Sequence, residues 1–122
     1  MIKNKEKILY YITDHGRGHA TRSIAIIREL QKYNVEIIVR NSNLGSTMKK
    51  SLPKIKIISG ITDVGPIIQN NGISINYQKS KKIIHNWIEN LEFYAEKESR
   101  LIDKINPQII ISDISVMPIL AA

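Results

Sequence analysis

The feature that most constrains the fold is a glycine-rich turn between an apolar run and a helical pattern. The run Ile8–Ile12 enters the turn, and residues 19–33 leave it with apolar side chains at helical spacing. This order predicts a strand, a tight turn and a helix that starts at the carboxyl end of the strand. Ligands bind there in open parallel sheets, because the first free N–H groups of the helix favour an anion. Gly16 and Gly18 would let the backbone approach such a ligand closely and take a positive φ.

Short β-branched runs alternate with helical patterns along the rest of the chain. The predicted strands are Ile8–Ile12, Val35–Arg40, Ile55–Ser59 and Gln108–Ser112. Helices are predicted over residues 19–33, 46–51, 80–105 and 115–122. Apolar runs of this kind are typical of strands buried in a parallel sheet. The alternation therefore predicts an α/β fold, a Rossmann-like parallel sheet with helices on both faces.

Two stretches of this pattern need separate expectations. Residues 80–105 are predicted to form one amphipathic helix, with Ile84 and Ile88 on its apolar stripe and Trp87 at the edge of the stripe. Residues 60–78 have little helical periodicity, and long irregular segments of compact domains are usually functional or mobile.

Length and composition define the class of protein. The 122 residues are enough for one domain, and the absence of cysteine excludes disulfides and thiolate metal sites. No leader pattern or long apolar run is present, so we expect a cytoplasmic protein. The pattern stops at Ile119–Ala122 without a helix cap, so residues 1–122 are expected to be a truncated half-domain. Such a fragment would expose Ile119 and Leu120, and it would self-associate or be only marginally stable.

The net charge of +7 favours anionic partners such as nucleotides, phosphates or the headgroups of a membrane surface. A lysine-rich proteome bias explains the same charge equally well. The lysine groups lack interleaved aromatic residues, and no helix-turn-helix or zinc-finger pattern is present, so nucleic acid is not an expected partner.

Three chemistries compete for the glycine turn. A dinucleotide site would need a third glycine where the sequence has Thr21, and an acidic residue where it has Arg40. Arg40 could instead bind a 2′-phosphate, which leaves an NADP-binding module as an alternative. In a second interpretation, His19 at the helix amino terminus acts as a general base and Asp113 orients it, because the ends of parallel strands lie side by side. The third is a binding domain that holds a phosphate without catalysis.

Each catalytic candidate also has a purely structural interpretation. His19 could cap the helix or pack against it, and Asp113 could be the N-cap of the last helix. No helix-spaced histidine pair suggests a metal site.

Three segments of the chain carry a family resemblance. Tyr10–Arg22 resembles the opening of family-28-like GT-B glycosyltransferases of the Gly-x-Gly-His-x-x-Arg type, and also the amino-terminal glycosyltransferase-like domain of arabinokinase-type proteins. Asp63-Val64-Gly65 with Gln69 is similar to a loop of that subgroup. Ile111-Ser112-Asp113 with Pro118 and Ala121-Ala122 resembles its later strand-to-helix corner.

The resemblance implies an acceptor-binding amino-terminal domain of an inverting glycosyltransferase, with a separate domain for the nucleotide-sugar co-substrate that these residues do not contain. It implies His19 as base and Asp113 as its orienting partner, with no metal and no further cofactor. The expected substrate-binding residues are Gly16, Arg17, Gly18, Arg22, Asp63, Gly65 and Gln69. The alternative is a non-catalytic sugar- or phosphate-binding domain of a multidomain sugar kinase. The chain by itself is expected to be inactive.

Overall fold

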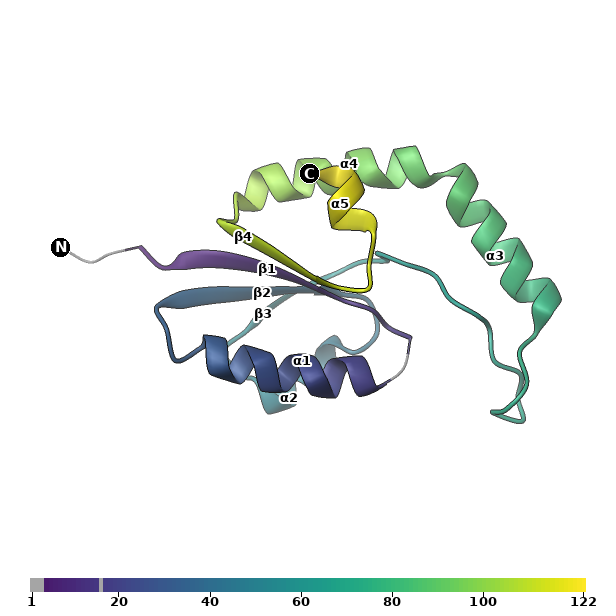
Figure 1. Cartoon of the computed structure of the whole chain (residues 1–122), viewed down its shortest axis with the longest axis horizontal. Coiled ribbons are helices and arrows are strands. Elements are labelled where there is room, and N and C mark those ends of the chain that lie inside the picture. Colours follow the sequence, from purple (N-terminus) through teal and green to yellow (C-terminus); the bar gives the residue numbers. More distant parts are fainter. Residues whose placement is uncertain (1–3, 16) are drawn as a thin grey trace.

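Four parallel strands form the centre of the protein (Figure 1). A computed structural model describes residues 4–15 and 17–122, with Arg17 described by its backbone alone. The strands are β1 (Glu6–Ile12), β2 (Val35–Asn41), β3 (Lys56–Ser59) and β4 (Ile109–Asp113). Their order in the sheet is β3-β2-β1-β4, and each neighbouring pair is parallel. The predicted α/β class and the four predicted strands are therefore confirmed.

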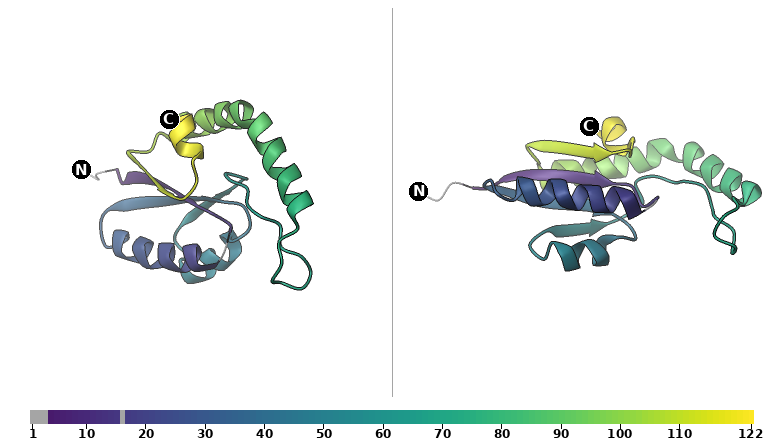
Figure 2. Two further views of the ribbon diagram at one scale, coloured as in Figure 1. Left: turned by 45° about the vertical axis from the view of Figure 1, so that its right-hand side comes forward. Right: turned by 60° about the horizontal axis from the view of Figure 1, so that its bottom comes forward.

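Helices cover both faces of the sheet, as predicted (Figures 1 and 2). One face carries α1 (Arg17–Leu30) and α2 (Gly45–Ser51), and the other carries α4 (Leu91–Ile105) and α5 (Met117–Ala121). Successive side chains of a strand point to opposite faces. Tyr10 of β1 accordingly packs in a core with Ile27 of α1, whereas Leu9 packs in a second core with Ile105 of α4.

The long helix predicted over residues 80–105 is divided at Asn90 into α3 (Tyr77–Glu89) and α4, so this prediction was wrong. The side-chain amide of Asn90 donates to the carbonyl oxygen of Asn86 at 2.8 Å. Asparagine competes in this way with the hydrogen bonds of a helix. The change of direction also interrupts the apolar stripe predicted for this helix. Ile88, expected on the stripe, is 61% exposed, whereas Trp87, expected at its edge, is buried and stacks on Tyr94. As a result, α3 extends away from the sheet (Figures 1 and 2).

A buried ion pair connects the sheet to α4. Nε and Nη2 of Arg40 donate to the two carboxylate oxygens of Glu98 at 2.9 and 3.0 Å, and the hydroxyl of Tyr11 donates to Glu98 at 2.7 Å. The Nη1 atom of Arg40 donates to the carbonyl oxygens of Ile58 and Ser59. Burial, reinforced by the hydrogen bond to Glu98, raises the pKa of Tyr11 above its ordinary range.

The same ion pair removes the basis for an NADP site. All three nitrogens of the Arg40 guanidinium donate inside the protein, so this side chain is not available to a 2′-phosphate. The sequence could not reveal this partner, since Arg40 and Glu98 are 58 positions apart.

The remaining segments follow the sequence expectations in part. Residues 60–76 are irregular, as predicted, with one antiparallel bridge between Ile68 and Ile75. The last helix, α5, begins at Met117 and has Pro118 in its first turn. Ile119 and Leu120 are 77% and 52% exposed, and self-association through them stays a prediction.

Among the described residues, no helix has the length and apolar character needed to cross a membrane.

Candidate active site

The carboxyl edge of the sheet is held in place by hydrogen bonds of polar side chains. Asp14, in the loop after β1, accepts hydrogen bonds from the backbone N–H groups of Ser42 and Asn43 at 3.2 and 3.0 Å. Asn41 at the end of β2 is fully buried and donates to the carbonyl oxygen of Ile12 at 2.9 Å. These bonds satisfy the loop backbones and fix the two loops relative to each other.

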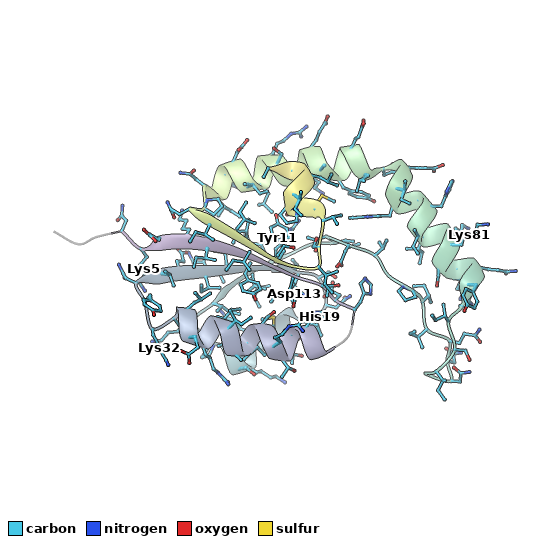
Figure 3. The ribbon with its side chains drawn as sticks, in the orientation of Figure 1. Lys5, Tyr11, His19, Lys32, Lys81 and Asp113 are labelled. Carbon is cyan, nitrogen blue, oxygen red and sulfur yellow. The ribbon has the colours of Figure 1, made fainter. Side chains whose placement is uncertain are left out.

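His19 and Asp113 meet at this edge. His19 lies in the first turn of α1, and Asp113 is the last residue of β4, paired in register with Ile12 of β1. Nδ1 of His19 is 3.1 and 3.2 Å from the two carboxylate oxygens of Asp113. Figure 3 shows the two side chains next to each other where β4 ends. The structure thus brings together the two residues proposed as base and orienting partner.

The alternative prediction that Asp113 is the N-cap of the last helix was wrong. The helix α5 starts at Met117 and its N-cap is Val116, so Asp113 does not cap it. The Asp113 carboxylate instead faces α1, where Ser23 also donates to it at 3.5 Å.

Arg22 is the third member of this cluster. Its Nη2 atom is 3.1 Å from Oδ1 of Asp113 and 2.8 Å from Nδ1 of His19, and its side chain is 60% exposed. Nδ1 of His19 cannot donate to Asp113 and accept from Arg22 at the same time. When Nδ1 carries the proton and donates to Asp113, Nε2 has a free lone pair and can act as a base. When Nδ1 accepts from Arg22, Nε2 carries the proton and cannot.

A second histidine–carboxylate pair consists of His15 and Asp63. Nε2 of His15 is 3.7 Å from Oδ1 of Asp63. Gly65 lies against the imidazole ring, since a Cβ atom at this position would be only 2.6 Å from Nδ1 of His15. Asp63 and Gly65 were predicted site residues, whereas the sequence assigned no role to His15; its only signal was its place inside the glycine turn.

The other predicted substrate-binding residues have different outcomes. Gly18 is helical, in the first turn of α1 and without a positive φ, which corrects the expectation of a left-handed turn at this glycine. A Cβ atom at Gly18 would meet nothing within 4 Å, so its surface is open. Gly16 and the side chain of Arg17 lie outside the described residues. Gln69 donates to the carbonyl oxygen of Ile75, inside its own loop.

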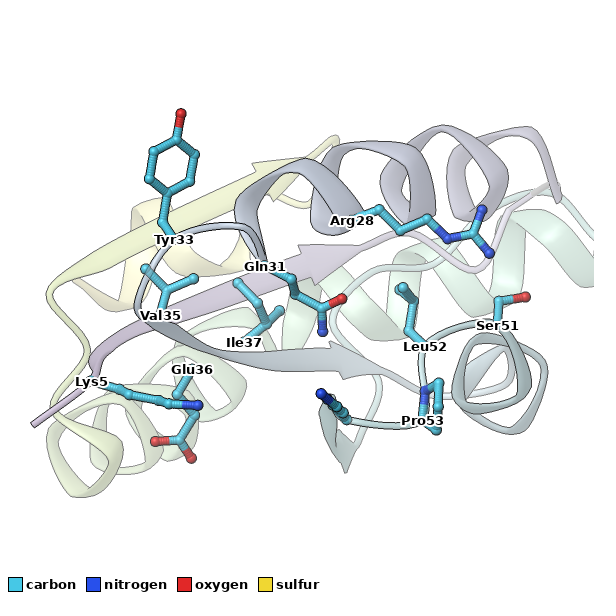
Figure 4. A pocket seen from close by; sticks show the side chains of 11 residues that line it. Lys5, Arg28, Gln31, Tyr33, Val35, Glu36, Ile37, Ser51, Leu52 and Pro53 are labelled. Atoms are coloured by element: carbon cyan, nitrogen blue, oxygen red, sulfur yellow. The ribbon is translucent and has the colours of Figure 1, made fainter.

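One cavity of the structure lies apart from this edge. A cavity of about 410 Å³, lined by Lys5, Arg28, Tyr33 and Pro53 among others, lies near the amino ends of β1 and β2 (Figure 4). It is at the opposite end of the strands from His19 and takes no part in the site. The part of the chain that the structure describes holds no group of three or more side chains suited to bind a metal ion.

Comparisons with known proteins agree with the resemblance noted in the sequence. No family model matches the chain. L-arabinokinase from Arabidopsis thaliana is 25% identical over 108 residues, which cover 86% of this chain and 10% of that protein. The chain therefore spans about a tenth of the curated relative that it matches.

The fold is also found in a solved glycosyltransferase. UGT73P12 from Glycyrrhiza uralensis, complexed with glycyrrhetinic acid 3-O-monoglucuronide, is similar with a TM-score of 0.56 and 12% identity. The alignment covers 89% of this chain and 24% of that one. The chain thus has the Rossmann-like α/β fold of part of a GT-B UDP-glycosyltransferase, together with a distant sequence similarity to L-arabinokinase.

Proposed function

We propose that this chain is the acceptor-binding domain of a glycosyltransferase that transfers a sugar from a nucleotide-sugar donor to an acceptor hydroxyl, with inversion at the anomeric carbon. The observation that supports the proposal is the contact of His19 Nδ1 with both carboxylate oxygens of Asp113 at the carboxyl edge of the sheet. In this proposal, the donor is bound by a second domain outside these 122 residues.

The chemistry of the reaction explains why such a pair is useful. A sugar hydroxyl is a poor nucleophile near neutral pH, and a base that removes its proton as the new bond forms contributes typically ~10²–10⁴-fold. Nε2 of His19 takes the proton from the acceptor oxygen while that oxygen bonds to the anomeric carbon, and the bond to the nucleoside diphosphate breaks. Asp113 holds Nδ1–H and stabilises the imidazolium that forms.

Arg22 has a separate role in this proposal. The leaving nucleoside diphosphate carries negative charge, and an exposed guanidinium at the same edge can stabilise it. Movement of Arg22 toward the phosphates would also release Nδ1 of His19 to donate to Asp113 alone.

A second candidate function is a sugar-binding domain of a multidomain sugar kinase, in which His19 and Asp113 bind the sugar without reaction. The observation that favours it is the similarity to a protein named L-arabinokinase. The sugar in that case would be L-arabinose or a closely related aldose.

Substitution of His19 distinguishes the glycosyltransferase domain from the sugar-binding domain, because only the first predicts a loss of sugar transfer. In the protein that carries this domain, His19→Ala should lower kcat for sugar transfer at least ~100-fold with nearly unchanged donor binding, and Asp113→Asn should lower it less. His85→Gln is the matched control, because His85 is exposed on α3 and paired with Glu89. Transfer at the wild-type rate by His19→Ala would exclude the base. Sugar binding without transfer in the wild type would favour the second candidate.

A further inference from the structure

We propose that Asp63 and His15 form a subsite that binds the vicinal hydroxyl groups of a carbohydrate acceptor. The inference rests on the proposed function, and it assigns the substrate class and the residues that hold the part of the acceptor that does not react.

The carboxylate of Asp63 is the observation that points to a ligand. Both of its oxygens are buried, and neither has a hydrogen-bond partner among the described residues. Its side chain is only 13% exposed. A buried carboxylate without donors is costly, because it gives up its hydrogen bonds to water without replacement. Unpartnered groups of this kind are rare in folded proteins, and a bound water, an ion or a ligand can account for them.

His15 gives the subsite its second polar group. Its ring is held beside Asp63 by packing on Gly65, and its side chain is 41% exposed, so it is open to a ligand from the solvent side. Nε2 is 3.7 Å from Oδ1 of Asp63, too long for a hydrogen bond and short enough for both groups to contact one ligand.

The combination of these groups selects the class of ligand. A hydroxyl group can donate to the carboxylate and accept from the imidazole, and two neighbouring hydroxyl groups can fill both oxygens of Asp63. A phosphate is disfavoured, because the carboxylate would repel it. A carbohydrate with a vicinal diol therefore fits better than an anionic ligand.

The subsite lies close to the His19–Asp113 pair. Asp63 follows Thr62, whose carbonyl oxygen accepts a hydrogen bond from the buried hydroxyl of Ser115 at 2.8 Å. Ser115 is two residues after Asp113, and His15 lies in the loop that leads to His19. The subsite thus belongs to the same edge of the sheet, where it can hold an acceptor whose reactive hydroxyl faces His19.

The experiment measures sugar binding to the 122-residue chain by NMR, with L-arabinose as the probe and the imidazole C–H signals of His15 as the readout. We expect saturable shifts with L-arabinose and with cis-cyclohexane-1,2-diol, and much weaker binding of cis-cyclohexane-1,3-diol, whose two hydroxyl groups do not lie on neighbouring carbons. Asp63→Asn should weaken binding of L-arabinose about tenfold or more, because it removes a charged acceptor.

Two further variants separate the subsite from a general loss of structure. Gly65→Ala should weaken binding while the chain stays folded, because the new methyl group displaces a surface ring and no backbone. Asp103→Asn is the matched control, since Asp103 is exposed on α4, and it should bind as the wild type does. Asp63→Asn should not lower the unfolding temperature, because the carboxylate has no hydrogen-bond donor to lose among the described residues.

The outcomes distinguish this inference from the proposed function. Equal affinity of wild type and Asp63→Asn for L-arabinose, equal binding of the two cyclohexanediols, or no binding at millimolar sugar would overturn the subsite and leave the role of His19 standing. Wild-type transfer by His19→Ala, with pentose binding still dependent on Asp63, would overturn the catalytic proposal and support the subsite.

Discussion

Backbone strain at the site concentrates in Ile114. This residue has φ of 79°, a left-handed conformation that is a true outlier for a β-branched side chain, and it lies directly after Asp113. The turn is kept closed by Ser112, whose hydroxyl donates to the carbonyl oxygen of Ser115 at 2.6 Å. Strain of this kind costs ~1–3 kcal/mol and persists where the surroundings determine the conformation. At this corner it sets the direction in which Asp113 leaves β4.

Substitution of Ile114 should therefore stabilise the protein. Ile114→Asn is expected to raise the free energy of unfolding by about 1 kcal/mol, because asparagine tolerates a positive φ. Urea unfolding measures the change. The matched control is Ile119→Asn, which also removes an exposed isoleucine but from the helical backbone of α5, and it should give no gain. Equal effects of the two substitutions would mean that the gain comes from lost apolar surface and not from strain.

At the scale of elements, the strands were predictable and the division of the long helix was not. Each strand is a short β-branched run, and burial in a parallel sheet requires only that such a run be apolar. The apolar spacing of residues 80–105 continues through Asn90, so it carried no sign of the break. Asn86 and Asn90, four residues apart and bonded to each other, were the available signal.

Asn90 should accordingly control the direction of α3. We expect Asn90→Ala to raise the helical content seen by circular dichroism, because alanine has no amide to compete with the helix and a higher helix propensity. The fluorescence of Trp87 should shift, since its stacking on Tyr94 spans the break with a centroid distance of 4.9 Å. Lys97→Ala, in the exposed middle of α4, should leave the fluorescence of Trp87 unchanged. An unchanged spectrum for Asn90→Ala would place the cause of the break in tertiary packing.

The candidate site was predictable to the extent that it depends on strand ends. His19 and Asp113 could be paired from the sequence, because the carboxyl ends of parallel strands meet at one edge. The pairing of His15 with Asp63 could not be foreseen, because residues 60–76 have no periodicity that would fix where they return to the sheet. The partner of Arg40 was hidden for a similar reason, since it comes from α4 on the other side of a long irregular segment.

At the scale of the whole molecule, the contact of Tyr11 and Arg40 with Glu98 joins the centre of the sheet to α4. Three elements contribute one side chain each, and all three side chains are buried. Such a network is stable only while every member keeps its partner and its charge state. Ionisation of Tyr11 would place a second negative charge beside Glu98.

The raised pKa of Tyr11 predicts a loss of stability at alkaline pH. The contribution of Tyr11 is fully present below its ordinary pKa of about 10 and declines as pH rises above it, because the unfolded chain releases the proton while the native state retains it. Urea unfolding at successive pH values from neutral to about 11 should show this decline.

Two phenylalanine variants test whether Tyr11 causes the loss of stability at alkaline pH. Tyr11→Phe should flatten the alkaline decline, although it lowers stability at neutral pH by about 1 kcal/mol through the lost hydrogen bond to Glu98. Tyr33→Phe should leave the decline unchanged, because Tyr33 is 73% exposed. Parallel curves for wild type and Tyr11→Phe would assign the alkaline transition to other groups.

The hydrogen bond from Ser115 to Thr62 gives the two histidine–carboxylate pairs a thermodynamic connection. Both residues are buried, so the loop that carries Asp63 cannot leave the corner that carries Asp113 without exposing or orphaning a polar group, at a cost of ~1–3 kcal/mol. We therefore expect order imposed on one pair to be shared by the other, and such a coupling would be reciprocal. Under the proposed function, an acceptor that binds Asp63 would also order the carboxylate partner of His19, so acceptor binding and the readiness of His19 for proton transfer would rise together.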